Sequence, residues 1–193
     1  MFPQQRQAIA AQHQTRMLAE ANEHRRARDI MAIDGTPLRV RPITHDDRDE
    51  LVRLFARLSP RSSQLRFFSP IRELSDAQML RLIDVDHECR DALVALNDAD
   101  EIIAEARYDG ECGSGEAEIA LTVEDVWQHR GVGIGLARRL MGLAAERGYE
   151  RFVANILPDN RAALGLVREL APDVSVRWDS GSYVATIPLA QAS

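Results

Sequence analysis

Polar and apolar residues alternate along several short stretches of the chain, with the two-residue period expected of half-buried β-strands. Together with short apolar runs, this pattern predicts strands at residues 38–43, 92–96, 102–108, 116–123, 152–157, 174–178 and 183–187. Turn-forming residues at 97–100 and 180–181 separate neighbouring strands, which predicts two β-hairpins.

Apolar residues recur at helical spacing in four other segments. The predicted helices span residues 44–58, 75–84, 136–147 and 160–170. Ser59 and Pro60 are expected to end the first helix, and residues 65–70, with two adjacent aromatic side chains, to form a connecting segment. The order of elements predicts an α/β fold with a mixed, largely antiparallel central sheet, flanked by helices and containing one parallel crossover.

Residues 1–34 are rich in Ala, Gln and Arg and contain no Gly, so they are predicted to be helical. Their large apolar residues form a thin stripe, which leaves two interpretations open: a solvated helical extension or a helix that binds a partner. The turn at residues 34–37 marks the predicted boundary. We therefore expect an N-terminal helical extension at 1–35 and a folded domain at 36–193.

The chain has 193 residues, of which 45% are apolar, enough for one domain with a substantial core. Its net charge of −6 argues against a nucleic-acid binder that works through bulk positive charge. The sequence has no signal-peptide pattern and no run of 18 apolar residues, so we expect a cytoplasmic protein without a membrane partner. Cys89 and Cys112 lack metal-ligand spacing; we expect reduced thiols rather than a disulfide or a zinc site.

A glycine-rich stretch directly precedes helix 136–147. Because Gly131, Gly133 and Gly135 have no Cβ atoms, successive backbone N–H groups can approach a bulky anion at the positive end of the helix. This pattern predicts a phosphate-binding loop, and a plain tight turn between a strand and a helix is the alternative. The Gly-Lys-Ser/Thr of a P-loop is missing, and the glycines lie too far from the preceding strand for a dinucleotide fingerprint.

The order Gln128-x-x-Gly131-x-Gly133 resembles the acyl-CoA pyrophosphate loop of the GNAT N-acetyltransferase superfamily. The predicted order of strands and helices resembles the fold of the same superfamily over residues 38–189. Residues 58–68, and the run Ala-Glu-Ile-Ala-x-Thr-Val before the loop, are similar to bacterial protein-lysine acetyltransferase catalytic domains. The chain is therefore identified as resembling this superfamily along most of its length.

The resemblance implies a sheet that is splayed between strands 116–123 and 152–157, with acetyl-CoA bound there as co-substrate and no metal. Free strand groups would bind the acetyl-pantetheine arm, and loop N–H groups the pyrophosphate. Many relatives carry Ser or Thr in place of Gly135, and Asn160 is equally suited to capping its helix. The implied contacts to acetyl-CoA are Leu121, Thr122, Val123, Gln128, Arg130, Gly131, Val132, Gly133, Ile134, Gly135 and Asn160.

Glu118 is the candidate catalytic residue, because the matching Glu of lysine-acetylating relatives accepts the proton of the amine. We expect partial burial to suit it to this role, although a strand Glu by itself would be expected to be exposed. Backbone N–H groups of residues 121–123 would stabilise the oxyanion. Many relatives have a Tyr general acid where this chain has Val167.

The resemblance predicts direct transfer of an acetyl group from acetyl-CoA to a primary amine, on a protein lysine or on a small molecule. Two alternatives stay open: an acyl-CoA-binding sensor that transfers nothing, which Val167 favours, and a nucleotide-binding domain. No nucleic-acid partner is expected. The N-terminal segment and the strand at 183–187 each offer a surface for a homodimer.

Overall fold

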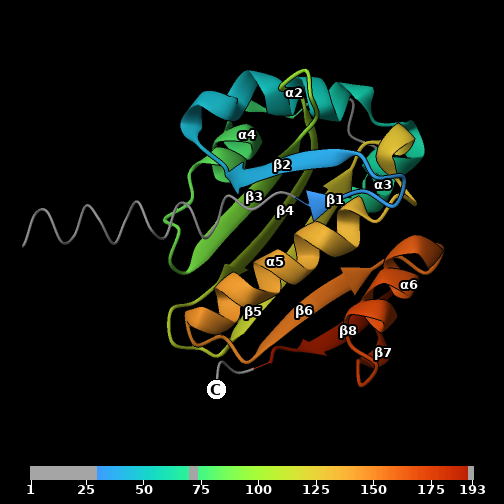
Figure 1. Cartoon of the computed structure of the whole chain (residues 1–193). Helices are drawn as coiled ribbons and strands as arrows, with labels where there is room; N and C mark the ends of the chain where they lie inside the picture. Colours follow the sequence, from blue (N-terminus) through green and yellow to red (C-terminus); the bar gives the residue numbers. More distant parts are fainter. Residues whose placement is uncertain (1–29, 70–73, 191–193) are drawn as a thin grey trace, which may run out of the picture.

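The computed structural model describes residues 30–69 and 74–190 of the chain. These residues form one sheet with the strand order β1-β2-β3-β4-β5-β6-β8-β7 (Figure 1). Neighbouring strands are antiparallel, except for the parallel pair β5 and β6. The predicted mixed sheet with one parallel crossover is thereby confirmed. The strands are β1 (Ile30–Met31), β2 (Pro37–Pro42), β3 (Arg90–Leu96), β4 (Ile102–Gly110), β5 (Glu116–Val123), β6 (Arg151–Ile156), β7 (Ser175–Asp179) and β8 (Ser182–Pro188).

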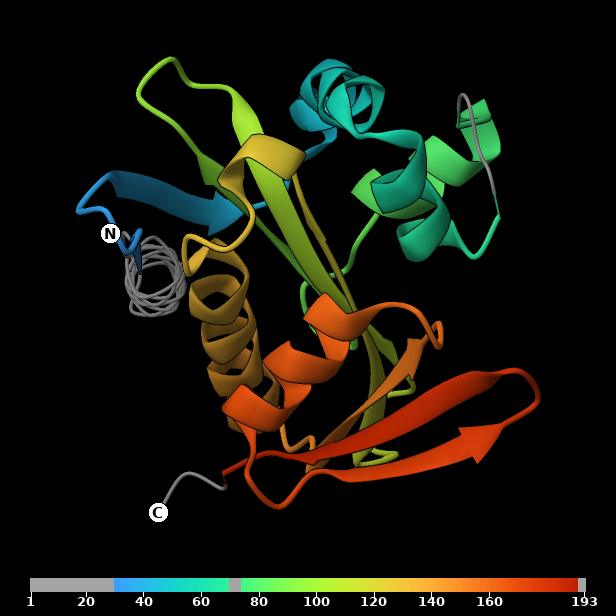
Figure 2. The ribbon, with the colours of Figure 1, turned by 90° about the vertical axis from the view of Figure 1, so that its right-hand side faces the viewer.

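Helices cover both faces of this sheet, with α5 and α6 on one face and α2 and α4 on the other (Figures 1 and 2). Strand alternation explains the two layers: Leu93 and Ala95 of β3 belong to the core under α5, and Ala92 and Val94 to the core under α2 and α4. None of the helices in the described residues is long and apolar enough to cross a membrane. The helices are η1 (His45–Asp47), α2 (Arg48–Arg57), α3 (Pro60–Phe67), α4 (Asp76–Ile83), η2 (Asp125–Trp127), α5 (Val132–Glu146) and α6 (Arg161–Leu170).

The parallel strands β5 and β6 separate part of the way along their length. Glu118 and Val153 form the last residue pair between them. Beyond this pair, β5 continues to Val123 and β6 to Ile156 with no further pairing between these two described strands. The backbone groups of β5 that lie past this pair on the side of β6 therefore have no strand partner there in the described part of the chain. We call this region the open end of the sheet.

The opposite end of β5 is closed by packing. The ring of Tyr108 lies 5.3 Å from that of Tyr149 and 5.7 Å from that of Phe152, and all three side chains are buried. Arg147, directly after α5, lies 3.0 Å from the fully buried carboxylate of Asp91 and donates a hydrogen bond of 2.9 Å to the Tyr108 hydroxyl. We call these five residues and their surroundings the closed end.

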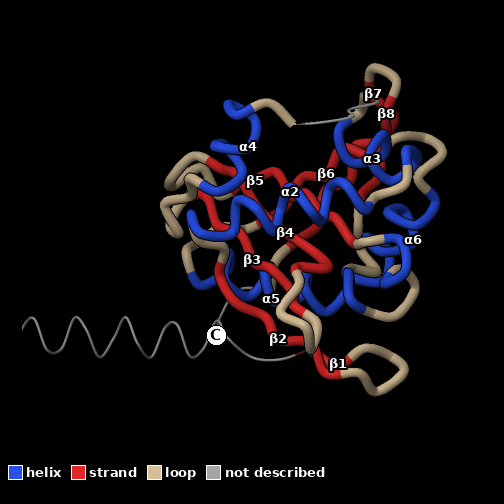
Figure 3. Tube along the Cα trace, turned by 90° about the horizontal axis from the view of Figure 1, so that it is seen from above, coloured by secondary structure: helices blue, strands red, loops and turns tan. Residues whose placement is uncertain are grey.

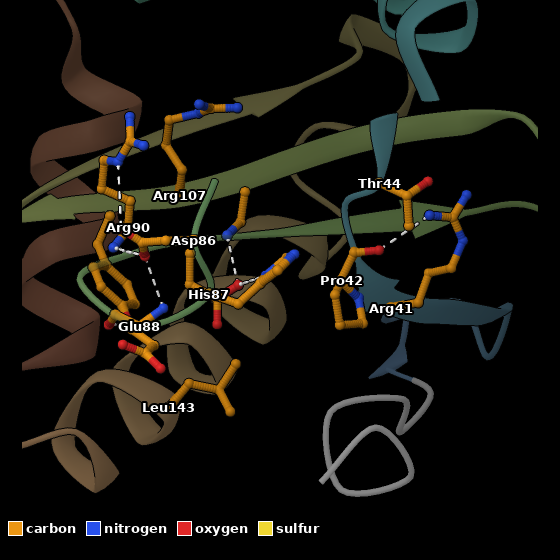
Figure 4. Close-up of polar contacts among 12 residues, drawn as sticks. Arg41, Pro42, Thr44, Asp86, His87, Glu88, Arg90, Arg107 and Leu143 are labelled. Carbon is orange, nitrogen blue, oxygen red and sulfur yellow. Dashed lines mark hydrogen bonds and ion pairs between the residues drawn. The ribbon is translucent and has the colours of Figure 1, made fainter. Parts of the chain in front are cut away.

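The loop before β3 completes the closed end (Figure 4). Asp86 accepts hydrogen bonds from the backbone N–H groups of Glu88 and Arg90, and His87 lies 2.7 Å from the Asp91 carboxylate. Cys89 and Cys112 form a disulfide, with their Cα atoms 5.0 Å apart. The expectation of reduced thiols is therefore wrong: the fold joins the start of β3 to the turn after β4, and sequence spacing carries no information about that contact.

The predicted N-terminal helix is wrong for residues 30–34. Ile30 and Met31 form β1, which pairs with β2, and Ala32 is buried in the core. Figure 3 shows β1 and β7 at opposite edges of the molecule. Residues 1–29 lie outside the described residues, so the helix expected there, and the boundary at residue 35, stay predictions. A strand of two residues has no alternation from which it could have been predicted.

The segment after α2 was also predicted incorrectly. Ser59 and Pro60 do not simply end a helix, because they begin α3: the Ser59 hydroxyl accepts a hydrogen bond of 3.2 Å from the Ser62 N–H. Pro at the first helical position costs no hydrogen bond, since that N–H has no partner inside a helix. Residues 65–67 are therefore helical rather than a connection, and α3 lies against β5. The other predicted strands and helices are present; β5 has the predicted ends, and the others are shifted at one or both ends.

Candidate active site

A cavity of about 1130 Å³ lies at the open end of the sheet. Its walls come from β5, the loop before α5, α3, β6 and α6, and this volume is sufficient for a large organic ligand. The structure brings most of the predicted site residues to it. Those that line the cavity are Glu118, Leu121, Thr122, Val123, Gln128, Gly131, Gly133, Ile134, Gly135 and Asn160.

Two predicted contacts do not line the cavity. Val132 has a buried side chain that belongs to the core. Arg130 lies 3.3 Å from the Asp34 carboxylate, and its guanidinium stacks 5.1 Å above the Trp127 ring. The side chains of these two residues therefore serve local packing, and only their backbone N–H groups are available to bind a ligand.

Glu118 lies where the pairing of β5 and β6 ends. Asn155 of β6 donates a hydrogen bond of 3.1 Å to its carboxylate. The side chain is exposed, so the protein without a ligand does not show the expected partial burial of Glu118. Since Glu118 also lines the cavity, its carboxylate is accessible to a molecule that enters there.

The glycine-rich stretch is more helical than predicted. α5 begins at Val132, so Gly133 and Gly135 lie in its first turn, and Gly131 alone of these three adopts a left-handed φ of 80°. A Cβ atom on Gly133 would lie 3.1 Å from the Leu121 side chain, which explains this glycine by close packing of α5 on β5. The first N–H groups of a helix have no acceptor within it, and here they adjoin the cavity.

Gly135 faces a part of the chain that was not predicted to reach the site. A Cβ atom at this position would lie 3.2 Å from the Ile30 side chain, and one on Gly131 would lie 3.2 Å from Ile33. The Ile33 N–H also donates a hydrogen bond of 2.8 Å to the Arg130 carbonyl. Ile30, Met31 and Ile33 line the cavity. The close approach of β1 thus explains Gly135, at a position where the family that the chain resembles often has Ser or Thr.

Gln128 links three elements around the cavity. Its side-chain amide donates to the Val123 carbonyl at 3.0 Å and to the Ser62 hydroxyl at 3.2 Å. Asp125 accepts hydrogen bonds from the hydroxyl groups of Ser59 and Ser62 at 2.7 and 2.8 Å. Burial alone would raise the pKa of Asp125, but the hydrogen bonds from Ser59 and Ser62 outweigh it and hold the pKa below its usual value. α3 is thereby fixed to the glycine loop and to the end of β5.

On the far wall, Asn160 caps α6, because its side-chain oxygen accepts a hydrogen bond of 3.0 Å from the Ala163 N–H. The capping interpretation is confirmed, and Asn160 also lines the cavity. Val167 is buried and lines the cavity too. Tyr108 and Tyr149 belong to the closed end. Within the described residues, no group of three or more His, Cys, Asp or Glu side chains could hold a metal ion.

Arg66 of α3 was missed as a site residue, although it lines the cavity. Its Nε–H donates a hydrogen bond of 2.9 Å to the Thr122 hydroxyl. The signal that could have found it is its place in residues 58–68, the segment that resembles protein-lysine acetyltransferases.

Comparison with known proteins agrees with this geometry. The family model described as "Acetyltransferase (GNAT) domain" matches residues 38–170. Acetyltransferase PA5475 of Pseudomonas aeruginosa is 33% identical over 153 residues, which cover 75% of this chain and 82% of that protein. Acetyltransferase Pat of Mycolicibacterium smegmatis is 33% identical over 124 residues, 63% of this chain and 37% of that protein. The crystal structure of the GNAT domain of S. lividans PAT matches with a TM-score of 0.80 and 32% identity, covering 84% of this chain and 97% of that one.

The chain therefore belongs to the GNAT acetyltransferase family. It is an acetyl-CoA-dependent acyltransferase, and the cavity at the open end is its candidate active site.

Proposed function

We propose that the protein transfers the acetyl group of acetyl-CoA directly to a primary amine, on a protein lysine or a small molecule, with Glu118 as general base. The observation that carries the proposal is the position of Glu118, an accessible carboxylate at the point where β5 and β6 separate. A carboxylate at this point can reach an amine that approaches a ligand bound along the free edge of β5.

Acetyl-CoA fits the chemistry of the cavity. Its acetyl-pantetheine arm carries amide groups that can pair with the free backbone groups of β5 beyond Glu118, as an added strand would. The pyrophosphate would meet the first N–H groups of α5 and the positive end of the helix dipole. The groups proposed for these contacts are the backbone groups of Leu121 and the N–H of Val123 on β5, and the backbone N–H groups of Arg130, Gly131, Val132, Gly133 and Ile134. The backbone groups of Thr122 face Glu105 of β4, and the Val123 carbonyl accepts the hydrogen bond from Gln128.

The transfer itself needs one base and one oxyanion site. The amine nitrogen attacks the thioester carbonyl carbon, Glu118 accepts the amine proton, and backbone N–H groups near Thr122 stabilise the oxyanion. The C–S bond then breaks and CoA leaves. A thiol with a pKa of about 8.5 is a tolerable leaving group as the thiolate, so Val167 in place of a Tyr acid does not prevent the reaction.

The rival function is an acyl-CoA-binding sensor, and its support is the same buried Val167, which supplies no acid. To separate the two functions, we would measure release of free CoA thiol from acetyl-CoA in the presence of spermidine, free amino acids or a lysine-containing peptide. Amine-dependent release that Glu118→Gln strongly slows at neutral pH supports the transferase. Tight acetyl-CoA binding by calorimetry without such release, for every amine, would support the sensor.

A further inference from the structure

The face of β4 and β5 that carries Glu118 also carries a buried cluster of charges. Thr122 of β5 lies opposite Glu105 of β4, and Glu118 lies opposite Asp109, so these side chains share one face of the sheet. Glu105 is fully buried, with no exposed surface. Its carboxylate contacts the guanidinium of Arg107 through one oxygen and lies 3.8 Å from that of Arg66 through the other. We call Glu105, Arg107, Arg66 and Thr122 the arginine cluster.

In this cluster Arg107 and Arg66 both contact the Glu105 carboxylate, but their other contacts differ. Arg107 also donates to the backbone carbonyl of Leu82 at 2.8 Å, which ties β4 to α4, and it does not line the cavity. Arg66 comes from α3, is 14% exposed and lines the cavity. Burial lowers the pKa of Arg66, and the negative charges of Glu105 and Glu118 oppose that shift. Since a guanidinium stays protonated under all ordinary conditions, Arg66 is a fixed positive charge beside the candidate active site.

Through Thr122, Arg66 contacts the part of β5 beyond Glu118, along which the proposed acyl transfer takes place. Beyond Glu118, β5 is paired with β4 alone, because the β6 side is open. Two side-chain contacts fix this free edge from α3: Arg66 holds the Thr122 hydroxyl, and Gln128 joins the Val123 carbonyl to Ser62. Arg66 is the charged one of the two, and its guanidinium forms an ion pair with the buried Glu105 carboxylate at 3.8 Å.

We propose that Arg66 is a positioning residue for acyl transfer: held by Glu105, it fixes Thr122 and with it the free edge of β5 on which the thioester must lie. This inference rests on the proposed acetyl transfer. A strand edge that shifts would misplace the oxyanion site relative to Glu118, even with acetyl-CoA bound. The planar fork of Arg can contact Thr122 and Glu105 at once, whereas the single ammonium of Lys cannot reproduce that geometry.

The test compares Arg66→Met, Arg66→Lys and Thr122→Val in the full chain. CoA-thiol release is measured with spermidine and with a lysine-containing peptide. We expect Arg66→Met to lower kcat by about 10- to 100-fold, the effect of a small misplacement of reacting groups, with a smaller change in the KM of acetyl-CoA. Arg66→Met leaves Glu105 paired with Arg107, so the fold should persist. Thr122→Val removes the acceptor and keeps the charge; it should lower kcat in the same way, and Thr122→Ser should lower it less.

A double-variant cycle separates positioning from general stability. If Arg66 acts through Thr122, the double variant Arg66→Met with Thr122→Val should be no slower than the slower single variant. The matched control is Arg147→Met at the closed end, which removes an arginine of similar exposure from another fully buried carboxylate, that of Asp91. It should lower the thermal midpoint and keep kcat.

Three results would overturn the inference alone. The first is an active wild type with Arg66→Met and Thr122→Val variants that keep its kcat. The second is full recovery of kcat by Arg66→Lys. The third is a double variant whose loss of kcat equals the product of the losses in the two single variants. A wild type that releases no CoA thiol with any amine would instead refute the proposed function, and this inference with it.

Discussion

β5 pairs with β4 along most of its length, but its two ends have opposite surroundings on the side of β6. At the closed end, Tyr108 packs against Tyr149 and Phe152, and Asp91 is paired with Arg147 at 3.0 Å. At the open end, β6 diverges after Glu118 and leaves a cavity of about 1130 Å³. Packing at the closed end keeps β5 and β6 together there, so the two strands can separate at the open end without loss of the sheet.

Both ends contain a fully buried carboxylate that is paired with arginine. Asp91 is enclosed by side chains of the closed end, and its arginine, Arg147, is fixed at the end of α5. Glu105 lies under the open end, and its arginine Arg66 reaches the cavity. The buried ion pair therefore serves the structure at the closed end and supports the chemistry at the open end. Which of the two roles it has depends on whether a neighbouring strand edge is free.

The largest effect on activity is expected from Glu118→Gln at the open end. We expect kcat to fall by about 10²- to 10⁴-fold at neutral pH through loss of the general base, with acetyl-CoA binding nearly unchanged. The defect should shrink as pH rises, because more of the acceptor amine is then already deprotonated. A pH profile of kcat/KM measures this.

Glu116→Gln is the matched control for that variant. Glu116 lies on the same strand but toward the closed end, where it pairs with Arg151 at 2.8 Å. It should keep the wild-type profile. If Glu118→Gln also matched wild type at every pH, the base would have to be another group.

The closed end should respond in stability and not in activity. In non-reducing buffer, Cys112→Ser should lower the free energy of unfolding by about 2–4 kcal/mol, since the disulfide to Cys89 no longer restricts the unfolded chain. The value of kcat should be unchanged, because the cavity lies at the other end. Denaturant unfolding with and without dithiothreitol measures this. Equal stabilities of wild type and variant without reductant would contradict the pairing.

At the open end, Gly133→Val should raise the KM of acetyl-CoA by about tenfold or more, the equivalent of about 1.4 kcal/mol. A side chain there would lie against Leu121 and push the start of α5 away from β5. Gly142→Val in the same helix is the control, because its Cβ atom would meet no atom within 4 Å. Wild-type acetyl-CoA affinity in a folded Gly133→Val protein would show that the loop does not hold the pyrophosphate.

The smallest effect is expected from Asp125→Asn, which weakens the attachment of α3 to the glycine loop. The folded pKa of Asp125 lies below its ordinary value of 3.8, so its contribution to stability is present above that value and is lost as pH falls through the folded pKa. Because the Asp125 residue is largely exposed and its carboxylate only partly desolvated, we expect less than about 1 kcal/mol at neutral pH. Thermal midpoints of wild type and variant should converge as pH falls through the folded pKa. A difference in thermal midpoint that stays constant across pH would show that ionised Asp125 is not its cause.

Most of the sheet could be predicted from the sequence. The alternation in residues 116–123 and the turn residues between neighbouring strands are local signals, and β5 was predicted with the ends it has. Local signals failed where a short element depends on distant contacts. β1 has two residues. α3 is capped by Ser59 and starts at Pro60, two residue types that also occur where helices end.

The candidate site divides in the same way. The glycine pattern and the strand with Glu118 could be read along the chain, since strand alternation and helix starts are set by neighbouring residues. The contact of Ile30 with Gly135, the bond of Arg66 to Thr122 and the disulfide of Cys89 were decided by tertiary structure. Each joins residues between 23 and 105 positions apart, and such pairs meet only because packing of the whole core brings their elements together.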